Sequence, residues 1–577
     1  MSFARRAATL LVALMLAVPP ADAASAQTAA PPLGTDPLDL SAKTTAWNVE
    51  GAPSLDRIWP TTRATLEQVR VRFPGVDGQS VEGFYPGPSY EYTRLPGWTP
   101  FYLYARDTAT IVPAARYLPG SKDLVSAVEE WLRLQYADGA ISATIAPDRT
   151  VDKATVVADE ETSLILAAET AFDASTSTAG ATWLRRDIRG RSVLRRLDDA
   201  AGWLLEQRLD ADTGLIWRGH TTDWGDVKWE PSRTPTDLEP GDQRTASIYD
   251  QAIAYAAFGA LARFHEAVGD AEGQAAWQQR AQALRDATER WLWQDAADRG
   301  FYRIHVHLQP DQIQHDFDEG TVVAIGNAAA VYYGLAPAER TSRVLSALER
   351  ARLNAGAPKP GLTVDPPYLG WQETQMGPRV YQNGALWDWW GGRQVSGEFR
   401  AGYSALARQH LEQIALDWAQ NPGKVYEWQS PWLARTSQDD GYAGAAGAVG
   451  EAVIAGLFGV DLRRGTLRIT PRLGLTAGWI RVYEPASGIS AAYRFSPTMA
   501  SISVEIATNS PDAVSVELPL PAAWSGPVRA TLDGADALPA SLTEVGEERH
   551  LVVVIPSGRH RVDFERVRPS GERTSWN

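Results

Sequence analysis

The feature that most constrains the fold is an alternation between two kinds of helical segment along residues 98–459. The stretch TASIYDQAIAYAAFGALARF is small and apolar on nearly every face, which is typical of a buried helix. The stretch AEGQAAWQQRAQALRDATERWLW, which follows it, is amphipathic and charged and therefore has a solvent face. Short turns such as Pro119-Gly120 and Gly269-Asp270 favour antiparallel helix pairs. The pattern predicts a mainly α chain with an inner ring of helices inside an outer ring, an (α/α)6 toroid.

Helical periodicity also gives approximate bounds for the segments. In the second segment, Ser121 is a candidate N-cap and Gly139 follows the predicted end. The loops at one end of the inner ring would hold any site. The predicted helices lie near 99–118, 121–139, 158–175, 189–208, 244–268, 271–293, 320–333, 338–352, 380–396, 399–419 and 440–458, with a further one near 56–73.

The texture of the chain changes after Asp461. Short runs with alternating apolar residues follow one another, separated by Gly, Pro, Asn and Asp, which is typical of strands in an all-β domain. The sequence therefore predicts a C-terminal antiparallel β-sandwich over 460–577, following an (α/α)6 barrel over 98–459. No catalytic residue types gather there, so we expect packing or surface contact. The runs are TLRITPRLG, WIRVYE, ISAAYRFS, SISVEIATN, AVSVELPL, HLVVVIP and HRVDFERV.

The N-terminus has the pattern of an export signal. Arg5 and Arg6 precede an apolar run, and small residues around Ala23 and Ala26 suit signal-peptide cleavage. The run is shorter than the roughly 20 residues that span a bilayer. We expect a signal peptide at 1–26, by the general or the twin-arginine route, and a periplasmic or secreted mature chain without membrane insertion. Residues 27–97 are expected to form a leader and a segment covering the site.

Composition excludes several function classes. The net charge of −15 argues against a nucleic-acid partner, because the phosphate backbone would be repelled. The absence of cysteine excludes disulfides, thiolate metal sites and cysteine nucleophiles. His305 and His307 share one face of a predicted strand, so a metal pair is conceivable, but ordinary polar residues are favoured. DFDEG, at 316–320, lacks the spaced oxygen ligands of a calcium loop. No metal and no organic cofactor are expected.

The stretch HTTDWGDVKWE, at 220–230, places Asp223 directly before Trp224 and Asp226 between Trp224 and Trp229. Tryptophan is costly to expose and aspartate is costly to bury, so the pairing needs an explanation. Burial against an aromatic wall raises the pKa of a carboxyl, because the ionised form loses hydration. A carboxyl in such a loop could therefore stay protonated near neutral pH.

Three other groups of carboxylates lie in aromatic or glycine-rich stretches. These are Arg106-Asp107 in YLYARDTAT, Asp159 to Glu161 in VVADEETSLI, and Glu427 beside Trp428 with Asp439 and Asp440 downstream. Each has a structural alternative. Glu160 and Glu161 could stabilise a helix N-terminus, Arg106-Asp107 could be a buried pair, and the downstream pair could cap a helix or face solvent.

Glycoside hydrolysis gives such carboxylates a purpose. An inverting enzyme uses one carboxylic acid to protonate the leaving oxygen and one carboxylate, roughly 6.5–9.5 Å away, to activate a water. Flat aromatic faces suit the apolar face of a sugar ring. The chain has 22 tryptophans, and many fall in Gly- and Pro-rich stretches. Trp387, Trp389 and Trp428, together with Trp224, are therefore candidates for a sugar platform.

Several motifs resemble those of six-hairpin glycosidases such as glucoamylase, trehalase and the glucosidase part of glycogen-debranching enzymes. YLYARDTATIVPAARYLPG resembles their first inner helix, which implies that Arg106 and Asp107 bind the terminal sugar's hydroxyls. We expect Glu160 to join them. TTDWGDV resembles the Trp-x-Asp segment, which implies that Asp226 is the general acid. The residues alone leave Asp223 as the other candidate for the acid; with Asp226 in that role, Asp223 would orient it or hold a sugar hydroxyl.

Two further segments extend the resemblance. VYEWQSPWLARTSQDDGYAGAAGAVGEAVIAGLFG resembles the last hairpin of these barrels, which implies that Glu427 is the general base. YQNGALWDWWGG resembles their Asn-Gly-x-x-Trp segment. The resemblance spans about 98–459 and implies an exported inverting exo-glycosidase, glucosidase-like, acting on an oligosaccharide or glycoside substrate. A disaccharide phosphorylase, a polysaccharide lyase on the same toroid and a non-catalytic sugar-binding protein remain as alternatives.

Overall fold

The computed structural model describes residues 36–567 apart from 88–100, 231–233, 297–298, 310–312, 314, 316, 372–373, 438–439 and 536. Met1–Asp36 and Pro37–Asn577 are separate units, and every helix and strand of the described residues lies in the second. The predicted signal peptide, residues 27–35 and 88–97 of the predicted leader and site-covering segment, and Asp439 lie outside the described residues.

Six buried helices form a closed ring. Each packs against the next along the chain, and the last packs against the first. Their small residues allow this close approach: a Cβ on Gly392 would lie 2.6 Å from the backbone of Ala448, and one on Gly447 would lie 2.7 Å from the carbonyl oxygen of Thr110. The inner helices are α3 (Ala105–Ala115), α5 (Glu160–Asp173), α8 (Ile248–Val268), α10 (Gly326–Tyr332), α12 (Asp388–Arg400) and α14 (Ala443–Glu451), which continues as a π-helix over Ala452–Leu457.

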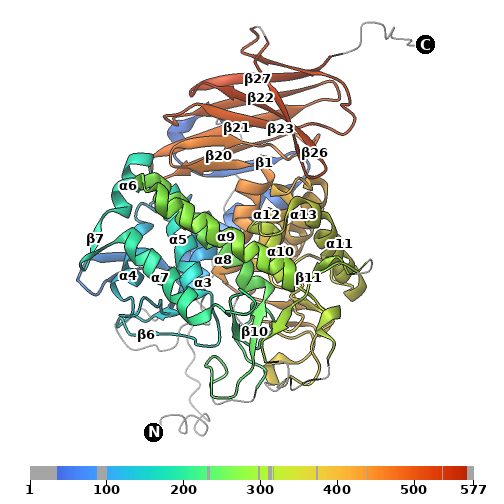
Figure 1. The fold of residues 1–577 in the computed structure, drawn as a ribbon. Helices are drawn as coiled ribbons and strands as arrows, with labels where there is room; N and C mark the ends of the chain where they lie inside the picture. Colours follow the sequence, from blue (N-terminus) through green and yellow to red (C-terminus); the bar gives the residue numbers. More distant parts are fainter. Residues whose placement is uncertain are drawn as a thin grey trace, which may run out of the picture. The chain divides into compact units, whose positions relative to one another are not determined.

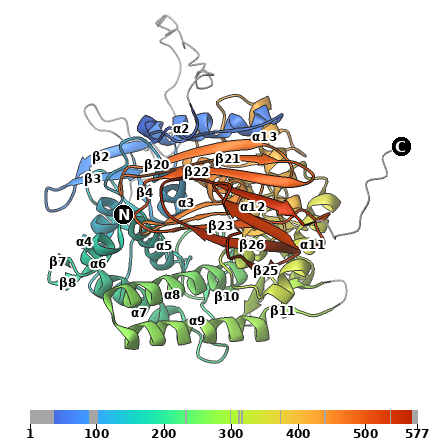
Figure 2. The same ribbon diagram turned by 90° about the horizontal axis from the view of Figure 1, so that it is seen from above.

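A second set of helices covers this ring from outside. α2 packs on α14, α4 on α5, α7 on α5 and α8, α9 on α8, α11 on α10 and α13 on α12. α8 and α9 run side by side in both views (Figures 1 and 2). The two rings together are the toroid that the alternation predicts. The outer helices are α2 (Ile58–Gln68), α4 (Val125–Arg133), α7 (Val193–Arg208), α9 (Ala271–Trp291), α11 (Ala338–Ala355) and α13 (Ser404–Gln420); the sequence did not predict α1 (Pro53–Asp56) or α6 (Ser177–Leu184).

Several inner helices begin later than predicted, because short strands precede them. β4 (Leu103–Tyr104), β10 (Arg244–Ser247) and β14 (Val323–Ala324) lead directly into α3, α8 and α10. Each pairs with a strand from another connection, so its residues are held extended where periodicity alone continued the helix. The partner strands are β5 (Thr144–Ile145), β9 (Arg218–Gly219), β13 (His305–His307) and β15 (Val364–Asp365).

Two larger sheets follow the ring. One has the strand order β1-β20-β21-β22-β27-β24 and the other β18-β19-β23-β26-β25; within them only the β19–β23 pair is parallel among the described residues. β1 (Ala46–Val49), from the segment predicted as leader and site cover, pairs with β20. The other strands are β18 (Val460–Arg463), β19 (Thr466–Ile469), β20 (Gly478–Glu484), β21 (Ile489–Pro497), β22 (Ser501–Thr508), β23 (Val514–Pro519), β24 (Val528–Leu532), β25 (Ser541–Val545), β26 (Glu548–Ile555) and β27 (Arg559–Arg566).

The sheets are joined to the ring by buried polar contacts and by a shared core. Arg116, at the end of α3, donates from Nε to Glu484 of β20 at 2.6 Å and from Nη2 to the carbonyl of Leu462 at 2.9 Å. The hydroxyl of Tyr493 donates to the carbonyl of Phe458 at 2.6 Å. Apolar residues of both regions belong to one continuous cluster. None of the helices in the described part of the chain is both long and apolar enough to cross a bilayer.

The remaining strands form hairpins and short ladders in the connections. They are β2 (Arg70–Pro74), β3 (Ser80–Phe84), β6 (Val151–Asp152), β7 (Asp187–Ile188), β8 (Arg191–Ser192), β11 (Trp293–Gln294), β12 (Phe301–Tyr302), β16 (Gln429–Ser430) and β17 (Arg435–Thr436).

Candidate functional site

The predicted site residues gather where the inner helices begin. Arg106 and Asp107 lie in the first turn of α3, and Glu160 begins α5. The loop at 220–230 precedes β10 and α8, and Glu427 lies in the connection that leads to α14. Backbone N–H groups at helix N-termini carry partial positive charge, so several carboxylates can be held near this end of the ring.

Asp226 is the one half-buried residue between His220 and Glu230; the rest of that loop is buried. Gln382, from the connection before α12, holds it at two atoms. The Gln382 side-chain oxygen accepts from the backbone N–H of Asp226 at 3.2 Å, and its nitrogen donates to Oδ1 at 2.7 Å. A Cβ on Gly225 would lie 2.7 Å from that Gln382 oxygen, so a larger residue here would displace the Gln382 side chain from its position on Asp226.

Asp223 fixes the same loop to two inner helices. Its Oδ1 accepts from the backbone N–H of Tyr249 at 3.1 Å, and its Oδ2 accepts from that of Gly326 at 2.7 Å. The residue is 0% exposed and has a φ of +65°, a conformation that aspartate tolerates better than most residues. Burial raises the pKa of Asp223 to about 7. Both oxygens are therefore engaged, which favours positioning of the loop over contact with a sugar.

The two tryptophans of the loop belong to different clusters. Trp224 packs in T-shaped geometry against Trp387 at 4.8 Å and against Trp389 at 5.4 Å between ring centroids. Trp229 packs against Trp371 at 4.9 Å, beside a group of histidines. The aromatic burial that the sequence suggested for the acid therefore acts on the neighbouring Asp223 rather than on the half-buried Asp226.

The predicted platform residues differ in how much surface they expose. Trp224 and Trp387 are each 1% exposed and Trp389 is 2% exposed, so these rings pack beneath the site and offer little surface to a ligand. Trp428 is 8% exposed and lies 6.3 Å from the ring of Tyr381.

Arg106 is held rigidly by a residue whose part in the site the sequence did not assign. Asp159 accepts from Nε of Arg106 at 2.7 Å and from Nη2 at 2.9 Å, a bidentate geometry. The hydroxyl of Tyr249 donates to the same carboxylate at 2.7 Å. The guanidinium also lies 6.0 Å from the ring of Trp224. Arg106 is thus a fixed positive charge at the mouth of the ring.

Asp107 lies beside Arg106 and accepts a hydrogen bond from the hydroxyl of Tyr442 at 2.9 Å. Burial raises the pKa of Asp107 to about 6, although the Tyr442 hydrogen bond and the charge of Arg106 oppose this; the negative charge of Asp226 adds to the rise. Asp107 and Asp226 therefore interact across the site.

Tyr381 lies in a segment that neighbours both predicted catalytic carboxylates: the next residue, Gln382, bonds Asp226, and the ring of Tyr381 lies 6.3 Å from that of Trp428, the residue after Glu427. The pKa of Tyr381 is raised well above the ordinary value by burial and by the negative charges of Glu427 and Asp226, and Arg106 opposes the rise. Glu427 is 8% exposed, and its backbone N–H donates to Ser437 at 3.1 Å. Two carboxylates 201 positions apart in the sequence thus both act electrostatically on the phenol of Tyr381.

The backbone around Tyr381 is constrained. It adopts a φ of +51°, uncommon for a bulky residue, and its carbonyl accepts from the indole N–H of Trp387 at 3.0 Å. Residues in uncommon backbone conformations cluster at functional sites, where the surrounding structure holds them in place. Here the buried Trp387 holds Tyr381.

Glu160 lies in a neighbouring buried group. Lys153 approaches Glu160 at 3.3 Å and Glu161 at 2.8 Å. Burial raises the pKa of Glu160 to about 7, with Lys153 opposing and Glu161 and Asp159 adding to the rise. Asp159 therefore connects this group electrostatically to Arg106. Further along the chain, Asp440 pairs with Lys424.

The site includes residues that sequence reasoning did not single out: Tyr249, Tyr381, Gln382 and Tyr442. Tyr381, Gln382 and Tyr442 lie within motifs quoted for the resemblance, and Tyr249 lies in the buried stretch TASIYDQAIAYAAFGALARF, so the signal was their position at or just before an inner helix. Charge alone drew attention to carboxylates and passed over these neutral partners.

A cavity of about 630 Å³ lies at the other end of the ring. Its lining includes Arg116, Arg400 and Glu451, at or toward the C-terminal ends of inner helices. The cavity contains none of the predicted site residues, so its volume does not mark the candidate active site.

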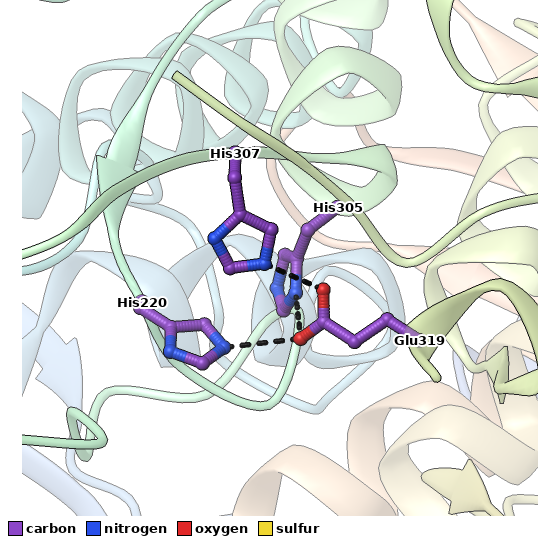
Figure 3. A group of neighbouring side chains, drawn as sticks. All are labelled: His220, His305, His307 and Glu319. Carbon is purple, nitrogen blue, oxygen red and sulfur yellow. Dashed lines mark hydrogen bonds and ion pairs between the residues drawn. The ribbon is translucent and has the colours of Figure 1, made fainter. Parts of the chain in front are cut away.

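A separate group can hold a metal ion. His220, His305, His307 and Glu319 place one donor atom each within 4.8 Å of one another (Figure 3). This group lies beside the loop that carries Asp226.

Comparisons with solved structures place the fold among glycosidase toroids. The chain matches an α-L-rhamnosidase from Dictyoglumus thermophilum with a TM-score of 0.60 and 11% identity, over 91% of this chain and 50% of that one. It matches a GH78 family rhamnosidase of Bacillus sp. GL1 with a TM-score of 0.57 and 16% identity, over 83% and 43%. It matches a Streptomyces avermitilis α-L-rhamnosidase complexed with L-rhamnose with a TM-score of 0.54 and 13% identity, over 90% and 42%.

At these identities the likeness concerns the fold, and it confirms the predicted resemblance to six-hairpin glycosidases at that level. The chain spans half or less of the length of these three chains. No family model matches the sequence, and no curated protein is similar to it in sequence.

Proposed function

We propose that this chain is an exported inverting exo-glycosidase that hydrolyses terminal glycosidic bonds of oligosaccharides or glycosides. The observation that carries the proposal is that one segment lies beside both carboxylates: Gln382 bonds Asp226, and the ring of Tyr381 lies 6.3 Å from that of Trp428, the residue after Glu427. Two carboxylates at one aromatic-lined site are the minimum that inverting hydrolysis requires. The fold shared with rhamnosidase structures supports the same reaction class. Export is proposed on the N-terminal sequence.

Each carboxylate has a defined step in this mechanism. Asp226 gives its proton to the leaving oxygen as the bond from the anomeric carbon to that oxygen breaks. Glu427 takes a proton from the water that attacks the opposite face of the anomeric carbon. The half-burial of Asp226 leaves it accessible to a leaving group, and Gln382 holds it in orientation. One water molecule is consumed, and the free sugar has inverted configuration.

Arg106 and Asp107 are proposed to bind hydroxyl groups of the terminal sugar. Both lie in the first turn of α3, and the negative charge of Asp226 raises the pKa of each. Asp159 and Tyr442 engage one side of each group and fix its direction, which reduces the entropy lost when a sugar binds. Trp428 is proposed as the aromatic contact, since it retains more surface than the tryptophans beneath it.

The C-terminal sheets are proposed to pack as a β-sandwich with a supporting role. Their strands pair in two sheets whose apolar residues join the core of the ring. Arg116 and Glu484 tie the nearer sheet to the end of α3. The sandwich would thus brace the ring from the end away from the candidate carboxylates.

The experiment is a kinetic comparison of two variants after a substrate is found. Aryl glycosides and oligosaccharides, including α-D-glucosides and α-L-rhamnosides, would be screened with the full chain. Asp226→Asn and Glu427→Gln should each lower kcat/KM at least about a hundredfold, within the range of about 10² to 10⁴ for acid–base groups. The exposed residues Asp212 and Glu544 supply matched controls, Asp212→Asn and Glu544→Gln, with unchanged rates.

Other outcomes would contradict the proposal. Turnover that requires inorganic phosphate would indicate a phosphorylase. An unsaturated product absorbing at about 235 nm from a polyuronate would indicate a lyase, which abstracts a proton beside the uronate carboxyl and consumes no water. Sugar binding without product, unchanged in Glu427→Gln, would indicate a non-catalytic binding protein.

A further inference from the structure

Four of the eight histidines of the chain gather in one buried place beside the loop at 220–230. His220 directly follows β9, and His305 and His307 stand on β13; the two strands flank β10 in one sheet. Alternation along β13 puts its two histidines on the same face. The sequence therefore paired His305 with His307, and the fold adds His220.

Glu319 supplies the carboxylate at the centre of the group. His220 Nε2 lies 3.1 Å and His305 Nδ1 lies 3.2 Å from its Oε1, and His307 Nε2 lies 2.7 Å from its Oε2. Figure 3 shows the three rings turned toward this carboxylate. His315 Nε2 lies 3.5 Å from the same Oε1.

One carboxylate oxygen cannot satisfy all the groups that face it. Oε1 of Glu319 is approached by His220, His305 and His315, and the hydroxyl of Tyr368 donates to it at 2.5 Å. An oxygen of this kind has about two lone-pair directions. A cation among the ring nitrogens resolves the excess, because each ring then gives its lone pair to the ion.

The other histidines of the chain show what an ordinary ion-pair arrangement looks like here. His265 has one ring nitrogen on Asp198 at 3.0 Å and the other on Asp270 at 2.8 Å. His410 lies between Glu398 at 2.9 Å and Glu349 at 3.1 Å. In these cases two carboxylates surround one ring, and both histidine pKa values are raised.

The cluster has the opposite ratio, with four rings around one carboxylate. Neutral imidazoles and an ionised carboxylate are the forms that bind metal ions.

Aromatic side chains enclose the group. Trp229 and Trp371 each lie 6.0 Å from the ring of His220, and Tyr368 packs on Trp371 at 5.1 Å between centroids. Such a shell limits the access of water and strengthens the interaction of a cation with its ligands.

We propose that His220, His305, His307 and Glu319 bind one divalent first-row transition-metal ion of the Zn²⁺ type. Three imidazoles and one carboxylate form a four-coordinate donor set of the kind that Zn²⁺ accepts. Ca²⁺ and Mg²⁺ are disfavoured, because both require mostly oxygen ligands. The proposal does not depend on the proposed hydrolysis.

The location gives the ion a structural role. The backbone N–H of Trp229 donates to the carbonyl of His220 at 2.9 Å, so the metal ligand lies at the point where the loop holding Asp226 closes on itself. His220 and Glu319 are 99 residues apart along the chain. An ion binding both would fasten this loop to β13 and to the η4 turn (Glu319–Thr321).

The test is metal analysis of the full chain, produced without a histidine tag. After treatment with a chelator and return of Zn²⁺, followed by removal of loose ions, elemental analysis should find about one ion per chain. The chelator should lower the melting temperature, and Zn²⁺ should restore it, because an ion that binds only the folded chain stabilises it. Substituted Co²⁺ should give the d–d absorption of a four-coordinate nitrogen- and oxygen-bound ion.

Variants assign the ion to the cluster. His305→Gln and Glu319→Gln should each lose most of the ion, while His265→Gln, which replaces a histidine held by two aspartates elsewhere, should keep it. If a ligand variant fails to fold, the reconstituted wild-type chain still decides. Less than about a tenth of an ion per chain after reconstitution with Zn²⁺ and Co²⁺ would overturn the proposal, and so would full occupancy in both folded ligand variants.

Discussion

Gln382 makes two hydrogen bonds with Asp226: its side-chain oxygen accepts from the backbone N–H at 3.2 Å, and its side-chain nitrogen donates to Oδ1 at 2.7 Å. The two residues come from connections 156 positions apart. Gln382 leaves the second carboxylate oxygen of Asp226 uncommitted, and that oxygen is available to carry the proton in the proposed mechanism. The carboxyl group is therefore oriented by a neutral partner that adds no charge to the site.

Replacing Gln382 by Ala should lower kcat/KM by about ten- to a hundredfold, because a misoriented acid loses part of its proximity advantage. Steady-state kinetics on the preferred substrate would measure this, with Gln135→Ala as the control. Gln135 contacts Gly139 and Arg196, away from the carboxylates. Equal kcat/KM values for the two variants would show that the hydrogen bonds between Gln382 and Asp226 do not contribute to turnover.

The role of Asp226 as acid predicts a dependence on the leaving group. Asp226→Asn should lose much more activity on an oligosaccharide than on an aryl glycoside with an acidic phenol, because such a phenol departs without protonation. Glu427→Gln should lose similar factors on both, since water activation is needed for either. Parallel losses for Asp226→Asn across both substrates would argue against this assignment.

The raised pKa of Asp107 predicts how substrate binding depends on pH on the acidic side. Burial raises its pKa to about 6, so the carboxyl is ionised above that pH and becomes neutral below it. If the ionised form accepts hydrogen bonds from sugar hydroxyls, KM should rise as the pH falls through about 6. Asp107→Asn should raise KM at neutral pH and remove that dependence. A KM profile unchanged by the substitution would contradict a binding role.

His410 predicts a loss of stability on the alkaline side. Glu398 and Glu349 raise its pKa to about 9 against burial, so the folded state holds the proton more tightly than the unfolded state. This contribution is fully present below the unfolded pKa of about 6.5 and is lost as the pH rises through about 9; a shift of this size corresponds to roughly 3 kcal/mol.

Thermal melting between pH 6.5 and 9.5 would measure it, compared in the wild-type chain and in His410→Gln. The variant should melt lower at about pH 6.5 and show a flatter fall of melting temperature with pH, because the linked proton is gone. An identical slope in both chains would mean that this histidine is not protonated in the folded state.

The alternation of helix types was sufficient to predict the toroid, because small apolar helices such as α8 can only be buried and charged ones such as α9 need solvent. The starts of the inner helices were less accurate. The stretch Arg244–Ser247 reads as helix by composition, but it is held as β10 between two other strands. Whether such residues form a strand or a helix depends on pairing with distant segments, which local periodicity does not reveal.

The candidate site divides in the same way. Charged residues in aromatic loops drew attention to Asp226 and Glu427. In the fold both carboxylates act electrostatically on the phenol of Tyr381. Their neutral and buried partners depend on tertiary contacts: Gln382 meets Asp226, and Tyr442 meets Asp107, only once the ring closes. The histidine cluster likewise joins three segments of the chain. The sequence drew attention only to His305 and His307, and the fold adds His220 and Glu319.

The configuration of the first-formed sugar tests the central claim most directly. Hydrolysis of a glycoside of defined anomeric configuration by the full chain, followed by proton NMR in phosphate-free buffer before mutarotation, reads it. Water activated by Glu427 on the face opposite to the Asp226-protonated leaving group must give the inverted anomer. A first product with retained configuration would contradict the account, because it would require a covalent intermediate on one of the carboxylates.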